Sequence, residues 1–257
     1  MKKILSVFMI LFAIILLAGC NKHTHDNELV VFAASSMTES LTEIAQIYKK
    51  QNPDVKLTFN FDSSGTLKTQ IEEGAECDVF ISASQKPMDS LDCIVLETRF
   101  DILLNNIVLV VPEDNPKSID SFDDLLIHLN KGDIILAIGN ADVPVGEYTL
   151  KIFDYYGLSE NELNSKGSLA YGTNVKEVTT HVSENMADCG IVYHTDASVA
   201  NLKVVDTATL DMCGRVIYPA AVIETSHNID LATDFLEFLN DVDASDVFIK
   251  YGFTPID

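Results

Sequence analysis

The chain has 257 residues, of which 47% are hydrophobic and 22% are charged, with only 12 Gly and 7 Pro. This length can bury a substantial core, and the composition excludes collagen-like, disordered and linker-dominated chains. Lys and Arg total 17 against 39 Asp and Glu, a formal net charge of −22 that repels nucleic acid and anionic membrane surfaces. We therefore expect a globular protein of one large domain or two lobes, with no nucleic-acid partner.

The first residues have the charge and hydropathy pattern of an export signal. Two lysines precede an apolar run over residues 4–17, which is too short to span a bilayer comfortably. The run ends in LAGC (residues 17–20), which resembles the bacterial lipoprotein signal and makes Cys20 the expected site of lipidation. The alternative is an ordinary signal peptide whose cleavage leaves a free thiol. We predict a signal peptide over residues 1–19, a polar tether over 20–27, and an extracytoplasmic protein that is lipid-anchored to the cell membrane.

From residue 28 onward, short apolar strands alternate with helical patterns, which predicts an α/β fold with a mostly parallel sheet. The first strand is expected over residues 29–33. Ser36 and Glu39 then have the capping-box spacing of a helix that begins just after Ser36. Further strands are expected at 55–61, 78–82, 107–111, 134–138, 168–171 and 190–193. Further helices are expected after residues 64, 145 and 175 and over 230–239 and 244–251.

Small or hydroxylated residues mark four of the junctions between a predicted strand and a predicted helix. They are SS at 35–36, SSG at 63–65, VG at 145–146 and NV at 174–175. In an open α/β sheet the ligand lies at the carboxyl ends of the strands, where each helix N-terminus presents unpaired N–H groups and a partial charge of about +0.5. One Ser at such a junction is most often only a helix cap, but the recurrence predicts an anion site.

Four cysteines follow Cys20, and none belongs to a CxxC motif, so a zinc ribbon or a thioredoxin-like site is not expected. In an exported chain an even number of cysteines predicts disulfides, and four cysteines allow three pairings. We expect neighbours to pair, Cys77 with Cys93 and Cys189 with Cys213. The alternative is four buried free thiols.

Seven segments, in one order along nearly the whole chain after the signal, resemble the extracytoplasmic molybdate-binding proteins of ABC transporters. They are VFAASSMTESL (31–41), FDSSGTLKTQIEEGAECDVFISASQKPMD (61–89), LLNNIVLVVP (103–112), VPVGEY (143–148), CGIVYHTDA (189–197), YPAAVI (218–223) and YGFTP (251–255). The resemblance implies a two-lobed periplasmic-binding-protein fold of type II with the ligand cleft between the lobes. Lobe 1 is expected to comprise residues 28–106 and 220–257 and lobe 2 residues 107–219, with crossings near Asn106 and residues 217–220.

The resemblance also implies a site that holds a tetrahedral oxyanion with hydroxyls and backbone N–H groups and without a countercharge. The matching hydroxyls belong to Ser36, Ser64 and Tyr193, and the matching N–H groups to Val145 and Val175. Four of these residues lie at the junctions selected above on physical grounds. Tyr193 is the exception, because its position alone would indicate half-buried packing.

The function implied by the resemblance is high-affinity binding of molybdate or tungstate outside the cytoplasmic membrane and delivery to an ABC permease with its ATPase. We expect no cofactor, no metal ion beyond that of the bound oxyanion, and a monomer.

Asp62 departs from the family's pattern, which more often has a small residue before the Ser-Ser pair. A carboxylate facing the ligand would repel a fully ionised oxyanion but could accept a proton from hydrogen phosphate. A receptor for sulfate or phosphate is therefore the alternative function. The simpler interpretation of Asp62 is a solvated charge at a strand end, on the face opposite Phe61.

A serine-dependent hydrolase is the third hypothesis. The chain has no GxSxG, HExxH or GxxxxGK[ST] motif. A nucleophilic Ser36 or Ser64 would need a histidine base, and His194 is the only histidine close to one of the quoted motifs. We therefore expect a binding protein and not an enzyme.

Overall fold

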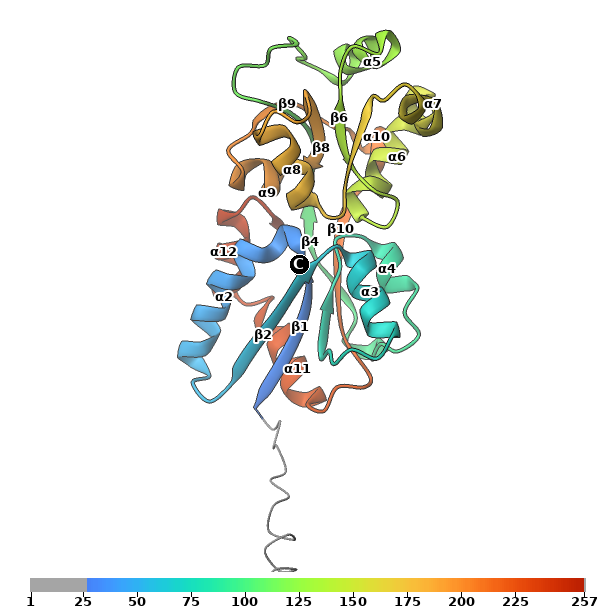
Figure 1. The fold of residues 1–257 in the computed structure, drawn as a ribbon. Helices are drawn as coiled ribbons and strands as arrows, with labels where there is room; N and C mark the ends of the chain where they lie inside the picture. Colours follow the sequence, from blue (N-terminus) through green and yellow to red (C-terminus); the bar gives the residue numbers. More distant parts are fainter. Residues whose placement is uncertain (1–26, 257) are drawn as a thin grey trace, which may run out of the picture.

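The computed structural model describes residues 27–256, which form two lobes stacked end to end (Figure 1). The predicted signal peptide and the predicted lipidation site Cys20 lie outside the described residues. Each lobe is built on one β-sheet with helices packed against it. Within residues 27–256 no helix is both long and apolar enough to cross a membrane.

The first lobe contains a mixed six-stranded sheet, in the order β11-β4-β10-β3-β1-β2. β1 is parallel to β2 and β3, whereas β10 is antiparallel to β3 and β4. The strands are β1 (Glu28–Ala34), β2 (Lys56–Asp62), β3 (Val79–Ile81), β4 (Phe100–Asn105), β10 (Val216–Val222) and β11 (Thr254–Pro255). The helices are η1 (Ser35–Met37), α2 (Thr38–Gln51), α3 (Ser64–Glu72), α4 (Gln85–Asp89), η2 (Leu96–Thr98), α11 (Ile229–Phe238) and α12 (Val242–Lys250).

The second lobe contains a five-stranded sheet, in the order β7-β6-β8-β5-β9. β6 is parallel to β7 and β8, whereas β5 is antiparallel to β8 and β9. The strands are β5 (Ile107–Val111), β6 (Leu136–Gly139), β7 (Leu169–Gly172), β8 (Cys189–Tyr193) and β9 (Lys203–Thr207). The helices are α5 (Phe122–Lys131), α6 (Pro144–Tyr156), α7 (Glu160–Ser165), α8 (Val175–Ser183), α9 (His194–Val199) and α10 (Leu210–Cys213).

The chain passes between the lobes twice. The first passage is at Asn106, the single residue between β4 and β5. The second lies at residues 214–215, because β10 pairs with β4 from its first residue, Val216. The boundary expected between residues 219 and 220 thus falls inside β10. Within β10, the register against β4 shifts between Tyr218 and Pro219, as expected where a proline interrupts the strand ladder.

Local signals predicted most of the strands and all three helix starts at the later junctions. α3 begins at Ser64, α6 at Pro144 and α8 at Val175. α6 ends at Gly157, which has the left-handed conformation (φ 67°) expected of a helix stop. No sequence signal predicted β4, β9, β10 and β11 as strands, or α4, α5, α7, α9 and α10 as helices. Ser121 nevertheless caps α5 by accepting a hydrogen bond from the Asp124 N–H at 3.1 Å.

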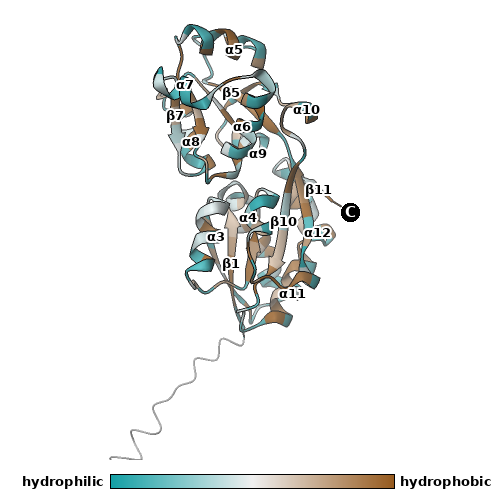
Figure 2. Ribbon diagram, turned by 90° about the vertical axis from the view of Figure 1, so that its right-hand side faces the viewer, coloured by the Kyte–Doolittle hydropathy of each residue, from teal (hydrophilic) through white to brown (hydrophobic). Residues whose placement is uncertain are grey.

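Hydrophobic residues run along the strands through the interior of both lobes, as Figure 2 shows. The cysteines contribute to these interiors: Cys77, Cys189 and Cys213 are buried and Cys93 is partly buried. All four are free thiols, so the predicted disulfides are wrong. Burial raises the pKa of the Cys77 and Cys189 thiols well above its usual value, which keeps them protonated and unreactive. They act as small core residues, which was the alternative interpretation.

Candidate functional site

A small cavity lies between the lobes, at the carboxyl ends of several strands. It brings together four of the five predicted site residues: Ser36 and Ser64 from the first lobe, and Val175 and Tyr193 from the second. The fifth, Val145, is buried directly after Pro144, which lines the cavity. The complete lining is Ala34, Ser35, Ser36, Asp62, Ser63, Ser64, Ala83, Val143, Pro144, Val175 and Tyr193. Of the described residues that line it, none is Lys or Arg.

Three helices begin at this cavity. Ser63 caps α3 by accepting a hydrogen bond from the Thr66 N–H at 3.1 Å, and Asn174 caps α8 by accepting one from the Glu177 N–H at 3.1 Å. Pro144 occupies the first turn of α6, where its missing N–H costs nothing. The predicted Asn174 cap is therefore confirmed. The N-terminal ends of these helices carry partial positive charge, so their arrangement favours an anion without any basic side chain.

The first junction differs from the prediction. Residues Ser35–Met37 form the short helix η1, α2 starts at Thr38, and neither helix has a side-chain cap. The Ser36 hydroxyl instead makes a hydrogen bond of 2.9 Å with the Tyr218 hydroxyl, and the Glu39 carboxylate binds Lys176. The predicted capping box is wrong because both side chains find partners elsewhere in the fold.

The hydroxyl of Ser64 is held ready to donate a hydrogen bond. Ser64 is fully buried at the first position of α3. Its oxygen accepts a hydrogen bond from the Ala83 N–H at 3.0 Å. Because a backbone N–H can only donate, the proton of the Ser64 hydroxyl is left for another acceptor. Since Ser64 also lines the cavity, that acceptor can be a bound anion.

Tyr193 reaches across from the second lobe. It ends β8, its side chain is buried, and its hydroxyl donates a long hydrogen bond of 3.5 Å to the Ala83 carbonyl in the first lobe. Burial raises the pKa of Tyr193 well above its usual value, so the phenol keeps its proton and stays a neutral donor. Its ring also packs edge-on against those of Tyr148 and Tyr218. The Tyr193 ring therefore packs in an aromatic cluster while its hydroxyl keeps a proton that it can donate.

Asp62 lies in the wall of the cavity and is partly exposed, so a solvated charge at the end of the strand stays compatible with its position. It is the last residue of β2, and its Oδ1 accepts a hydrogen bond from the Ser63 N–H at 2.7 Å. That contact ties the carboxylate to the start of α3 and keeps it beside the two serines. Asp62 is thus the one carboxylate among the described lining residues.

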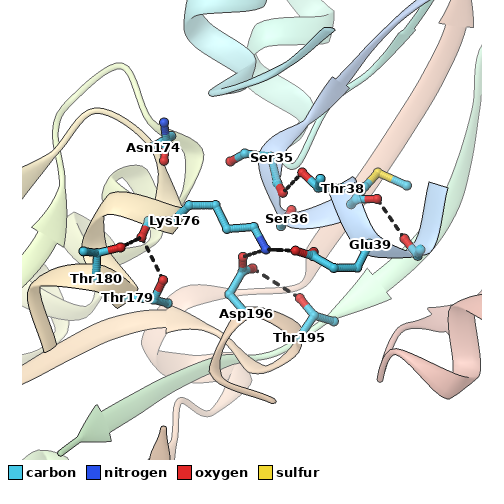
Figure 3. A network of polar contacts seen from close by, with 12 residues as sticks. Ser35, Ser36, Thr38, Glu39, Asn174, Lys176, Thr179, Thr180, Thr195 and Asp196 are labelled. Carbon is cyan, nitrogen blue, oxygen red and sulfur yellow. Dashed lines mark hydrogen bonds and ion pairs between the residues drawn. The ribbon is translucent and has the colours of Figure 1, made fainter. Parts of the chain in front are cut away.

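An ion-pair network joins the lobes on one side of the cavity (Figure 3). Lys176 follows Val175 in α8, and its ammonium lies 2.8 Å from a carboxylate oxygen of Glu39, in α2 of the other lobe. The same ammonium lies 3.5 Å from Oδ1 of Asp196, which is 1% exposed. Burial raises the pKa of Asp196 to about 6, against the lowering effect of Lys176. No sequence pattern indicated this network, since its members are up to 157 residues apart.

The lobes also touch on the opposite side of the cavity, here through the backbone. A Cβ atom on Gly65 would lie 2.1 Å from the carbonyl oxygen of Asp142, closer than any side chain tolerates. Only a glycine fits this contact between the start of α3 and the loop before α6. Nearby, the Ser84 hydroxyl donates a hydrogen bond of 3.2 Å to the Glu147 carboxylate, also between the lobes.

Metal-ligating clusters are not part of this arrangement. Across the described residues, no group of three or more His, Cys, Asp and Glu side chains is placed to hold a metal ion. The cavity therefore offers hydrogen-bond donors and helix ends, and its chemistry is that of an anion receptor.

Comparisons with known proteins agree with this geometry. Residues 29–254 match the family described as bacterial extracellular solute-binding protein. Over 233 residues the chain is 37% identical to molybdate-binding protein ModA of Haemophilus influenzae, which covers 88% of this chain and 90% of that relative. It is 33% identical over 254 residues to the putative ABC transporter substrate-binding lipoprotein YvgL of Bacillus subtilis, with 94% of each chain covered.

A solved structure shows the same architecture. The substrate-binding domain of a putative molybdenum ABC transporter from Clostridium difficile superposes with a TM-score of 0.66 at 34% identity, covering 90% of this chain and 99% of that one. The predicted two-lobed α/β fold, with a ligand cleft between the lobes, is confirmed. The expectation of a mostly parallel sheet is wrong, because both sheets mix parallel and antiparallel pairs. The chain belongs to the bacterial extracellular solute-binding proteins.

Proposed function

We propose that this protein binds molybdate or tungstate outside the cytoplasmic membrane and delivers it to an ABC permease driven by its ATPase. The observation that carries the proposal is the convergence of donors from both lobes on one cavity without a basic side chain: Ser36 and Ser64 from one lobe, Val175 and Tyr193 from the other. The similarity to ModA of Haemophilus influenzae supports the choice of ligand.

The five residues have distinct roles in this proposal. Ser36 and Ser64 donate hydroxyl hydrogen bonds to the oxyanion, and Tyr193 does so once its single proton turns from the Ala83 carbonyl to the ligand. Val145 and Val175 donate from the backbone in the first turns of α6 and α8. Hydrogen bonds to a charged ligand are strong in a desolvated cavity, so neutral donors can hold a dianion in a protein of net charge −22.

We further propose attachment to the outer face of the membrane through lipidated Cys20, and action as a monomer without a cofactor. The lipoprotein name of the Bacillus subtilis relative supports the anchor. The test is Cys20→Ala, which should release the protein into the soluble fraction or leave it uncleaved, because the tether offers no second anchor. A variant that is still cleaved and still membrane-bound would contradict the lipoprotein proposal.

The ligand proposal is tested by calorimetric titration of the mature protein with molybdate, tungstate, sulfate and phosphate. We expect molybdate and tungstate to bind most tightly. Ser64→Ala should weaken molybdate binding about 10- to 100-fold, because a hydrogen bond to a charged group contributes about 1.5–3 kcal/mol. Ser183→Ala is the matched control, since that serine is exposed at the end of α8. Equal effects of the two substitutions would contradict the assigned site.

A protonated oxyanion such as hydrogen phosphate is the second candidate ligand, and the position of Asp62 in the cavity wall favours it. A carboxylate could accept the proton of such a ligand. Tight phosphate binding that disappears in Asp62→Ala would show that Asp62 is a ligand acceptor and that the molybdate proposal is wrong. The hydrolase hypothesis gains no support, because His194 is exposed and is not among the residues lining the cavity.

A further inference from the structure

A buried chain of hydrogen bonds leads from the first crossing between the lobes to Ser36. It starts at Asn105, the last residue of β4, whose Oδ1 accepts a hydrogen bond from the Asn106 N–H at 2.8 Å. A backbone N–H only donates, so the accepting atom must be the amide oxygen. This contact fixes the orientation of the Asn105 side chain and points its NH₂ group away from Asn106.

The NH₂ group of Asn105 donates to two hydroxyls. One is that of Tyr218 at 3.2 Å, in β10 of the first lobe, and the other is that of Thr195 at 3.0 Å, in α9 of the second. Both amide hydrogens are thereby used. The Tyr218 hydroxyl, which accepts from Asn105, must direct its own single proton elsewhere.

Tyr218 has one suitable acceptor for that proton. Its side chain is fully buried, and burial raises the pKa of the phenol well above its usual value, so the proton stays on the oxygen. Besides Asn105, the hydrogen-bond partner of this hydroxyl in residues 27–256 is the Ser36 oxygen, at 2.9 Å. A buried donor is satisfied wherever an acceptor is within reach. Tyr218 therefore donates to Ser36.

The direction of these hydrogen bonds determines what Ser36 can do. Its oxygen accepts from Tyr218, so its own proton is free, and Ser36 lines the cavity. Ser64 is held in the same state by the Ala83 N–H. We propose that Asn105 and Tyr218 are positioning residues that orient the Ser36 hydroxyl as a donor into the cavity, and so make the site select fully deprotonated tetrahedral oxyanions. The inference rests on the proposed function.

Selectivity follows because a protonated oxyanion needs an acceptor for its own hydrogen. With the oxygens of Ser36 and Ser64 both engaged as acceptors of protein hydrogens, neither serine turns readily to receive one. A buried donor left without an acceptor costs free energy, and that cost falls on hydrogen phosphate but not on sulfate or molybdate. Asp62 is the acceptor that remains in the cavity wall.

The test compares sulfate with hydrogen phosphate at mildly alkaline pH, because the two are tetrahedral dianions of similar size and only the second carries a proton. In Tyr218→Phe the Ser36 hydroxyl loses its donor and becomes free to accept. We expect affinity for sulfate and molybdate to fall about fivefold and affinity for phosphate to stay level or rise, so the sulfate-to-phosphate ratio falls at least about fivefold. An unchanged ratio would overturn the proposal.

Two further variants separate this effect from a structural disturbance. Thr195→Val removes the other acceptor of the Asn105 amide without touching Ser36, so the ratio should stay at the wild-type value. If it shifts as far as in Tyr218→Phe, the proposal is overturned. Asn105→Ala should lower the sulfate-to-phosphate affinity ratio, as Tyr218→Phe does, but by a smaller factor. If Tyr218→Phe does not fold, an unchanged ratio in Asn105→Ala overturns the proposal. A wild-type protein that binds sulfate and phosphate but not molybdate contradicts the proposed ligand and leaves this ratio test intact.

Discussion

The two lobes meet on both sides of the cavity, and the two contacts are of different kinds. On one side the bare backbone of Gly65 lies against the carbonyl of Asp142, with no room for a side chain. On the other side Lys176 bridges to Glu39 and to the buried Asp196. Each contact lies one residue beyond a proposed donor, since Gly65 follows Ser64 and Lys176 follows Val175. We call them the backbone edge and the ionic edge.

The two edges control the approach of the lobes through different forces. Steric repulsion at the backbone edge is steep, so a single added methyl group changes the distance at which the lobes can meet. The ion pair at the ionic edge acts over a longer range but is weakened by solvent, because the side chains of Lys176 and Glu39 are each about one-third exposed. We therefore expect the backbone edge to set the distance at which the lobes meet. We expect the ionic edge to make the contact between the lobes sensitive to pH and salt.

The largest effect is expected from Gly65→Ala, which places a methyl group against the Asp142 carbonyl. Overpacking of this kind costs about 1–3 kcal/mol, so molybdate affinity should fall up to about 100-fold in calorimetry. The unliganded protein should keep its melting temperature, because the clash lies between the lobes and not within one. Thr69→Ala, one turn further along α3 and exposed, is the control. A Gly65→Ala protein with wild-type affinity would show that the lobes do not approach this closely around the ligand.

At the ionic edge, Asp196→Asn should stabilise the protein. The native pKa of about 6 lies above the ordinary value of 3.8, so between these pH values the unfolded chain releases a proton that the native protein keeps. The contribution of Asp196 to the free energy of unfolding is therefore greatest below about pH 4 and falls as pH rises to about 6. Above that range the variant should be more stable than the wild type by about 3 kcal/mol.

Thermal or denaturant unfolding from pH 4 to pH 8 measures this difference, which should disappear towards the acid end. The neighbouring charges that face Asp196 are Lys176 and Glu39. If Asp196→Asn is less stable than the wild type at pH 8, the attraction of Lys176 outweighs the cost of burying the carboxylate. That result would contradict the prediction that ionised Asp196 destabilises the protein.

The smallest effect is expected from Glu39→Gln, which removes one carboxylate of the ionic edge and keeps its shape. Partly exposed ion pairs contribute about 0.2–1 kcal/mol, so molybdate affinity should fall no more than about fivefold. The loss should shrink further in high salt, because salt screens the pair that is being removed. Titrations at low and high ionic strength check both points. If Glu39→Gln lowers molybdate affinity as much as Gly65→Ala does, the ionic edge is as important for binding as the backbone edge, and the proposed ranking of the two edges is wrong.

Local sequence patterns were sufficient to predict the local parts of the site. Ser63 and Asn174 act as caps of α3 and α8, and Pro144 and Gly157 delimit α6, because each of these signals operates within a few residues of its own position. Strand alternation and apolar runs gave the strands that carry the predicted donors to the cavity. Four helix starts at the ends of strands were enough to predict an anion site before any fold was known.

Features that depend on a distant partner could not be predicted from local patterns and are set by tertiary packing. Ser36 has the spacing of a cap but bonds to Tyr218, 182 residues away, and Lys176 pairs with Glu39 across 137 residues. Four cysteines were compatible with disulfides or with core packing, and the packing of the lobes leaves them as thiols. Local patterns are fixed by the geometry of adjacent residues, whereas pairing across the lobes depends on how both sheets are folded and brought together.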